Sequence, residues 1–85
     1  MIALTICERR IVNTLIAAHP ARLTLREIAH RSHVGLDTAR KRRIWDKLEA
    51  AGIAEAIRAD DNAGHPRYLY KAVDAFVMAQ DNARN

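Results

Sequence analysis

The chain has little of what disulfide scaffolds and membrane spans are built from. Its 85 residues include one cysteine, two prolines and three glycines. The single Cys7 cannot form an internal disulfide, and no apolar run approaches the roughly 20 residues that a membrane-spanning helix needs. The amino terminus also lacks an apolar secretion signal, so we expect a cytoplasmic protein without a membrane partner.

The residue types that carry catalysis and metal binding are also sparse. The sequence has no glycine-rich phosphate loop and no nucleophile and base at a recognisable spacing, and a domain of this size has almost no volume for a substrate cleft. We therefore predict that it is not an enzyme and needs no cofactor. His30, His33, His65 and Cys7 could ligate a metal, but no Cys-x-x-Cys motif is present. We interpret them as surface histidines and a small buried thiol.

Composition predicts one small globular domain. Hydrophobic residues make up 49% of the chain and charged residues 28%, whereas aromatic residues make up only 5%. This balance is typical of a folded domain and argues against a surface built for base stacking. We expect one domain over residues 1–85, with its core at about 5–73 and a carboxyl-terminal tail at 74–85.

Positive charge is concentrated in one short segment. The chain has 14 basic and 10 acidic residues, a formal net charge of +4. Residues 40–47 contain five bases and one acid, which is also a net +4, so the rest of the chain is balanced. A local cationic field suggests a polyanionic partner such as nucleic acid. A short basic run is also common on a solvated helix face, so the charge alone does not identify that partner.

Capping patterns predict the first two helices. Thr5 and Glu8 have the spacing of a capping box, and a helix should follow from about Ile6 to Ala18, where His19 and Pro20 stop it. A second capping box at Thr24 and Glu27 predicts another helix over 25–32. A turn at 33–36 should follow, in which Gly35 can adopt a positive φ.

A third helix is predicted over residues 37–51, with Asp37 as its amino-terminal cap and Gly52 at its end. After Gly52, residues 53–58 and 67–73 favour β-strands around a polar turn. The tail should begin with a short helix through Ala75 and Met78. The fold class is therefore mainly α with a small β-hairpin.

The third helix has two different sides. If it is continuous, Ile44, Trp45 and Leu48 lie toward the core, and Thr38, Ala39 and Arg42 lie on or near the opposite side, with Lys41 nearer the core. Arginine and threonine can contact base edges in the major groove of B-DNA, and a small alanine permits close approach. The outer side of this helix is therefore a candidate DNA-reading surface.

Three stretches of the chain resemble the winged helix-turn-helix family of bacterial and phage transcriptional regulators, which includes MarR-like and ArsR-like repressors. Residues 23–29 are similar to the start of the second helix of that family. Residues 35–41 and 45–52 resemble its recognition helix, and residues 64–70 resemble the entry into its last wing strand. The chain lacks the long dimerisation helices of MarR-like proteins, and no small-molecule effector site is evident.

The resemblance implies a three-helix core, a β wing and a short carboxyl-terminal helix. It also implies a sequence-specific regulator of transcription that acts as a repressor and binds double-stranded DNA. Helix 37–51 would read the major groove, and the wing at 58–67 would contact the backbone or the minor groove. The predicted DNA-binding residues are Thr38, Ala39, Arg40, Arg42, Arg43, Lys47, Arg58, His65 and Arg67.

Two further expectations concern partners. One such module covers little DNA, so we predict a homodimer joined through helix one and the tail around Phe76 and Met78. The alternative function is a winged-helix adaptor or phage-encoded inhibitor that presents its basic helix to an acidic protein surface, because fold does not determine function.

Overall fold

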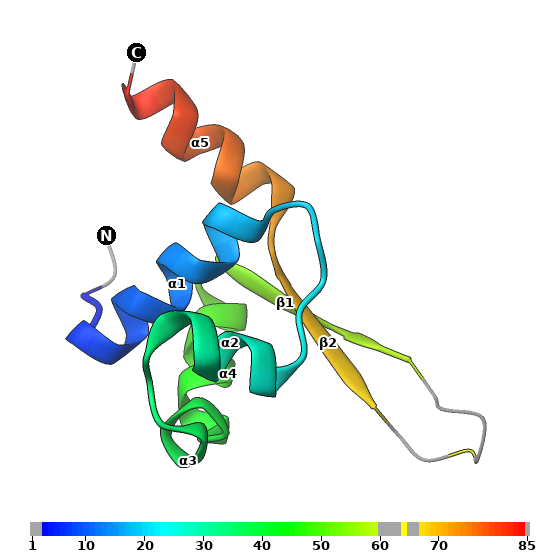
Figure 1. The fold of residues 1–85 in the computed structure, drawn as a ribbon. Helices are drawn as coiled ribbons and strands as arrows, with labels where there is room; N and C mark the ends of the chain where they lie inside the picture. Colours follow the sequence, from blue (N-terminus) through cyan, green and yellow to red (C-terminus); the bar gives the residue numbers. More distant parts are fainter. Residues whose placement is uncertain (1–2, 60–63, 65–66, 85) are drawn as a thin grey trace.

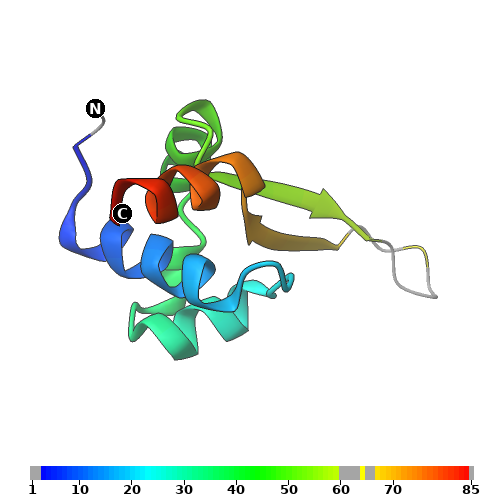
Figure 2. The same cartoon turned by 90° about the horizontal axis from the view of Figure 1, so that it is seen from above.

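The computed structural model describes residues 3–59, 64 and 67–84, and this part of the chain is mainly helical with one two-stranded antiparallel sheet (Figure 1). The elements follow in the order α1 (Ile6–Ala18), α2 (Leu25–Ser32), α3 (Leu36–Ala39), α4 (Arg42–Ala50), β1 (Ala54–Arg58), β2 (Tyr68–Ala72) and α5 (Asp74–Arg84). The strands extend away from the helical body in both ribbon views (Figures 1 and 2).

Both predicted capping boxes are confirmed. The Thr5 hydroxyl accepts the backbone N–H of Glu8 at 3.2 Å, and the Glu8 carboxylate accepts the backbone N–H of Thr5 at 2.8 Å. Thr24 and Glu27 make the same reciprocal pair at 3.2 and 3.0 Å. Each box satisfies two backbone donors that a helix start leaves unpaired, so α1 and α2 begin where the sequence predicts.

The core lies between α1, α2, α4 and the base of the hairpin. Every one of these elements contributes side chains that are almost fully removed from solvent. The buried apolar residues of this cluster are Ile11, Val12, Leu15, Leu23, Ile28, Val34, Ile44, Trp45, Leu48, Ile53, Ala54 and Ala72. Burial of this apolar surface is the main stabilising contribution to a domain of this size.

The hairpin pairs in a single register, from Ala54 opposite Ala72 to Arg58 opposite Tyr68. Leu23 exchanges two backbone hydrogen bonds of 2.8 Å with Tyr70, which ties the segment before α2 to the same strand. This contact fixes β2 beside the helical core. The strands are therefore anchored to the rest of the domain through backbone as well as side chains.

Two local predictions between the helices are wrong. The left-handed residue after α2 is His33, with φ 58°, whereas Gly35 has φ −55° and caps α3. Histidine tolerates this conformation better than most residues, so a glycine is not required. Asp37, expected to cap the third helix, lies within α3 instead. Outside this segment, Cys7 of α1 is exposed rather than buried as predicted. Gly52, with φ 72°, ends α4 in the left-handed conformation that was expected.

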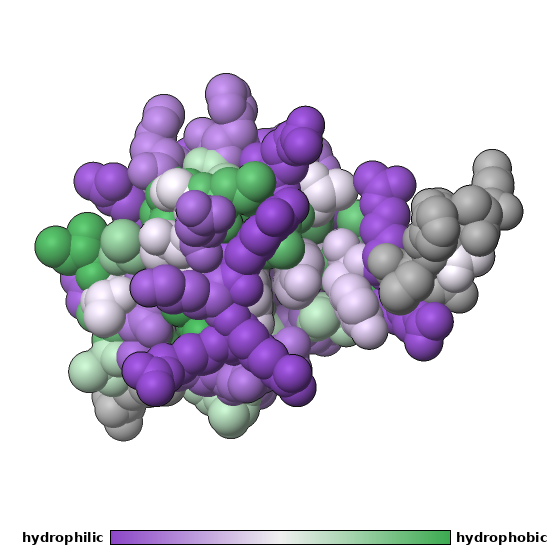
Figure 3. All heavy atoms as spheres, turned by 90° about the horizontal axis from the view of Figure 1, so that it is seen from below, coloured by the Kyte–Doolittle hydropathy of each residue, from purple (hydrophilic) through white to green (hydrophobic). Residues whose placement is uncertain are grey.

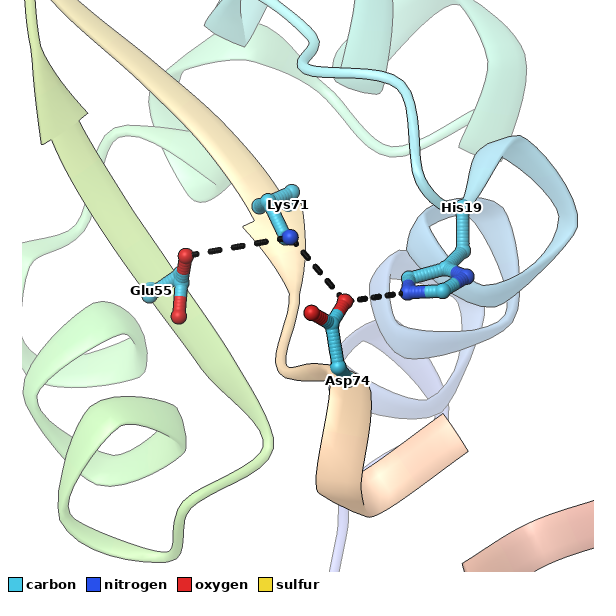
Figure 4. A network of polar contacts seen from close by, with 4 residues as sticks. All are labelled: His19, Glu55, Lys71 and Asp74. Carbon is cyan, nitrogen blue, oxygen red and sulfur yellow. Dashed lines mark hydrogen bonds and ion pairs between the residues drawn. The ribbon is translucent and has the colours of Figure 1, made fainter. Parts of the chain in front are cut away.

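The carboxyl-terminal helix is longer than predicted. α5 begins at Asp74 and continues to Arg84, past the short segment that carries its apolar residues. Its first turn is held by a polar network (Figure 4) in which Asp74 accepts a hydrogen bond from His19 Nε2 at 2.6 Å and from Lys71 Nζ at 3.0 Å. Lys71 also lies 4.0 Å from Glu55. The network joins the end of α1, both strands and the start of α5.

A nearly buried ion pair links α1 to α4. Lys47 Nζ donates to Glu8 Oε1 at 2.8 Å, and the Glu8 side chain is only 8% exposed. The Lys47 ammonium, followed by the backbone N–H of Thr5, lowers the pKa of the Glu8 carboxyl below its ordinary 4.5. Folding therefore favours the ionised form of Glu8. The stability that this carboxylate contributes is lost as pH falls through its lowered pKa.

We therefore expect Glu8→Gln to lower the free energy of unfolding at pH 7 by about 1–3 kcal/mol, because Lys47 loses a charged acceptor. Between neutral pH and pH 3 the variant should lose less stability than the native chain. Urea unfolding at both pH values measures the two effects. Glu49→Gln, at an exposed position of α4, is the control, and equal pH dependence in the native chain and Glu8→Gln would contradict the assignment.

Candidate nucleic-acid interface

The predicted continuous helix over 37–51 is wrong, because the chain forms α3 and α4 with a break at Arg40 and Lys41. Lys41 is extended, with φ −63° and ψ 115°, and precedes the first residue of α4. The backbone N–H of Ile44 donates to the carbonyl of Lys41 at 3.0 Å, three residues back, instead of to Arg40. The break therefore lies inside the basic run.

The spacing of charged and apolar residues explains the break. In a continuous helix, residues three and four positions apart share a face. Lys41 precedes Ile44 by three positions and Trp45 by four, so a continuous helix would direct it toward the core beside them. Burying an unpaired ammonium costs several kcal/mol, whereas losing a backbone hydrogen bond costs about 0.5–1.5 kcal/mol. Breaking the helix is therefore the smaller cost.

The break also moves Ala39, which was expected on the outer side. Its side chain is 0% exposed, so the predicted placement is wrong. Ala39 lies five positions before Ile44, a spacing that faces outward in a continuous helix but inward across this break. Its carbonyl accepts a hydrogen bond from the indole Nε1 of Trp45, which confirms Trp45 as a core residue. Thr38, next to it, is half-buried.

The four consecutive basic residues are all exposed, and we call Arg40, Lys41, Arg42 and Arg43 the cationic corner. The Arg42 side chain is 92% exposed and lies 3.8 Å from Asp46, a loose contact that solvent screens. The side of the molecule that carries α3 presents mainly hydrophilic side chains (Figure 3). The corner adjoins the first turn of α4, whose unpaired N–H groups add to the positive potential.

Lys47, also predicted to bind DNA, is turned away from the corner. Its ammonium is already bonded to Glu8, and only 32% of the side chain is exposed. Contact with a phosphate would require this pair to open. Lys47 thus contributes to the packing of α4 on α1, and its role at the interface stays a prediction.

A groove of about 440 Å³ separates α4 from the hairpin. On its α4 side lie Arg40, Arg42 and Glu49, and on its hairpin side lie Tyr68 and Tyr70. Tyr70 stacks on Trp45 with ring centroids 4.4 Å apart, while Tyr68 is 48% exposed. Burial and then Glu49 raise the pKa of the Tyr70 hydroxyl, which therefore stays protonated at neutral pH.

Tyr68 is a candidate interface residue that sequence reasoning missed. The low aromatic content argued against a stacking surface, and no local pattern in β2 singled out this ring. Tyr68 is exposed and lies opposite Arg58 near the open end of the hairpin. Tyr70, two residues on, packs on the core instead.

The predicted wing residues are only partly described. Arg58 ends β1 and Arg67 precedes β2, and both are exposed. Both therefore lie at the end of the hairpin away from the core. His65 lies outside the described residues, so its expected contact with DNA stays a prediction.

Other site types find no support within residues 3–59, 64 and 67–84. No group of three or more histidine, cysteine or acidic residues in this part of the chain could hold a metal ion. None of the helices described here is long and apolar enough to cross a membrane.

The sequence matches no protein-family model and no curated protein. Among solved structures, the fold is similar to the crystal structure of a protein from Ralstonia eutropha JMP134, described as a "putative DNA-binding protein". The TM-score is 0.68 at 17% sequence identity, and the similarity covers 98% of this chain and all of the other. At this identity, the likeness shows that the two proteins share a fold.

Proposed function

We propose that this protein is a winged helix-turn-helix regulator of transcription that binds double-stranded DNA. The observation that carries the proposal is the cationic corner, where four consecutive basic side chains are exposed next to a hairpin. Neutralising phosphates with such residues releases counterions, which drives most nucleic-acid binding. The shared fold with a protein described as DNA-binding is consistent with this function.

The arrangement supports distinct roles for the corner residues. Arg42, at the first position of α4, is the candidate for reading base edges in the major groove, with Thr38 nearby. Arg40, Lys41 and Arg43 are suited to phosphates on either side. Arg58, Arg67 and Tyr68 would follow the backbone or the minor groove along the hairpin. We therefore assign the reading of bases in the major groove to α4, in place of the continuous helix 37–51 that the sequence predicted.

Selection of bound sites from a random duplex library tests sequence-specific binding. A specific regulator should enrich one motif, which would be palindromic if the protein binds as a dimer. Retention of all duplexes alike would exclude a specific repressor. If no duplex binds at low salt, the alternative of a protein-binding adaptor for an acidic surface gains support.

Arg42→Ala should relax base preference at one position of the selected site. A bidentate arginine contact with guanine contributes about 1–3 kcal/mol of discrimination, so the preference should fall roughly 5- to 150-fold. Competition binding with single-base variants of the site measures the change. Arg9→Ala, at an exposed position of α1, is the matched control and should leave the preference unchanged. An equal loss of affinity for every sequence would reassign Arg42 to phosphate contact.

The proposed dimer would form through α1 and α5. Met78 is 64% exposed on α5, whereas Phe76 and Val77 pack partly against the core. Ile16 and Ala17 of α1 line a hollow next to α5. We expect Met78→Asp to convert a dimeric mass to a monomeric mass in light scattering, with His30→Asp, at an exposed position of α2, as the control. A monomeric mass of the native chain, both free and on DNA, would exclude this dimer.

A further inference from the structure

One buried polar contact connects the core to the cationic corner. The Trp45 side chain is almost fully buried, and its indole N–H donates to the carbonyl of Ala39 across the break between α3 and α4. The other side of Trp45 is fixed by the stacked ring of Tyr70 in β2. Trp45 therefore ties α3, α4 and the hairpin together at one point.

The indole N–H bonds a carbonyl that a backbone N–H would bond in a continuous helix. There, the carbonyl of Ala39 would accept the N–H of Arg43, four residues later. Across the break, the Trp45 indole donates to this carbonyl, which would otherwise be a buried acceptor without a partner. The hydrogen bond thus removes the main penalty for breaking the helix at this point.

Closing the break would change which cations reach a partner. In a continuous helix, Lys41 lies three positions before Ile44 and four before Trp45 and faces the core with them, whereas Arg40 lies at the border of that side. In the broken arrangement both are exposed. The break therefore brings Lys41 to the surface and raises the number of surface cations at the corner from three to four.

We propose that Trp45 is a positioning residue for the cationic corner, whose indole N–H keeps the break open so that all four cations can face nucleic acid. This proposal rests on the proposed function, because it assigns the corner a nucleic-acid partner. Trp45 itself touches no nucleic acid in this arrangement. It acts through Ala39 and through the backbone at Arg40 and Lys41.

Trp45→Phe tests the proposal because phenylalanine keeps a ring against Tyr70 but has no N–H. Duplex affinity is measured across salt concentrations, since the slope of log K against log salt changes by about 0.9 for each phosphate contact. We expect the slope to fall by about 0.9, as Lys41 turns toward the core. Backbone carbon chemical shifts at Lys41 should move from extended to helical values.

Ile11→Val is the control for a purely structural effect, because it weakens the core in α1, remote in sequence from the corner. It should lower the melting temperature without changing either the slope or the shifts at Lys41. If Trp45 had a purely structural role, Trp45→Phe would also lower the melting temperature and leave the slope and the shifts at Lys41 unchanged. An unchanged slope in Trp45→Phe, with Lys41 still extended, would therefore overturn the proposal.

A second pair of variants is independent of Trp45. Lys41→Gln and Lys41→Leu remove the same charge, but only leucine is tolerated on the core side of a continuous helix. Both variants should lower the slope by about 0.9, because each removes one cation, but only Lys41→Leu should give helical chemical shifts at position 41. Extended shifts at position 41 in both variants would contradict a break that depends on the core-facing charge.

Failure of the proposed function has a different outcome. If the native chain binds no duplex at low salt, the nucleic-acid partner is excluded for the corner. The chemical shifts at Lys41 in the native chain, Trp45→Phe and the Lys41 pair then decide the positioning role without DNA. Helical shifts at Lys41 in the native chain would overturn that role directly.

Discussion

Replacing Arg40, Lys41, Arg42 and Arg43 together by glutamine is expected to lower affinity for duplex DNA on the order of a thousandfold at 50 mM salt. The four side chains are exposed at one corner and hold few protein contacts, so the substitutions should leave the fold intact. Their effect comes from lost phosphate neutralisation and therefore grows as salt is lowered. Fluorescence anisotropy of a labelled duplex measures the affinity.

A charge-matched variant separates the corner from overall charge. Replacing the exposed Arg9, Arg10, Arg22 and Arg31 by glutamine changes the formal net charge from +4 to zero, as does the corner variant. If the corner is the interface, this second variant should retain most of the affinity. Equal losses in both variants would mean that DNA responds to net charge and that the corner has no special role.

The second large effect concerns stability. Leu48 is fully buried on α4, on the side opposite the interface, and Leu48→Ala should reduce the free energy of unfolding by about 2–5 kcal/mol. A domain of this length has a total stability of about 4–13 kcal/mol, so the melting temperature should fall by roughly 10–30 °C. The loss combines missing apolar burial with the cavity that the shorter side chain leaves.

Thermal unfolding followed by circular dichroism measures this change. Glu49→Ala, at the next and exposed position of α4, should change the stability by no more than about 0.5 kcal/mol. A melting temperature that is the same for Leu48→Ala and Glu49→Ala would contradict the placement of Leu48 in the core. Because α4 carries both core and interface, the comparison also tests the orientation of the helix.

Local patterns predicted the elements that depend on neighbouring residues. The capping boxes at Thr5 and Thr24 fixed the starts of α1 and α2, because each box involves residues only three apart. Gly52 fixed the end of α4 through its left-handed conformation. The two strands were predicted from composition and turn residues, to within one residue at each end.

The break between α3 and α4 could not be predicted in the same way. A helical wheel assumes a continuous helix, so it placed Ala39 outward and Lys41 near the core without asking whether a charge can be buried there. The charge of Lys41 on the core side was the only indication of the break in the sequence. The break depends on Trp45, whose indole bonds the carbonyl of Ala39 six residues earlier, and on Tyr70 in β2, which stacks on Trp45. Neither contact is visible in a local pattern.

Two other differences have similar causes. α5 was predicted to be short, yet alanine is the strongest helix former, and Ala79 and Ala83 favour its continuation. Lys47 was assigned to DNA because it belongs to the basic segment, but its partner Glu8 lies 39 positions earlier. Ion pairs between distant segments depend on the packing of helices, which spacing along one helix does not determine.

Binding of the native chain to a duplex across salt concentrations tests the central claim most directly. If Arg40, Lys41 and Arg43 contact phosphates, log K should fall linearly with log salt with a slope of about −2.7 or steeper. The corner variant should flatten this slope by about the same amount, whereas the charge-matched variant should not. Absence of duplex binding by the native chain at low salt would contradict the account.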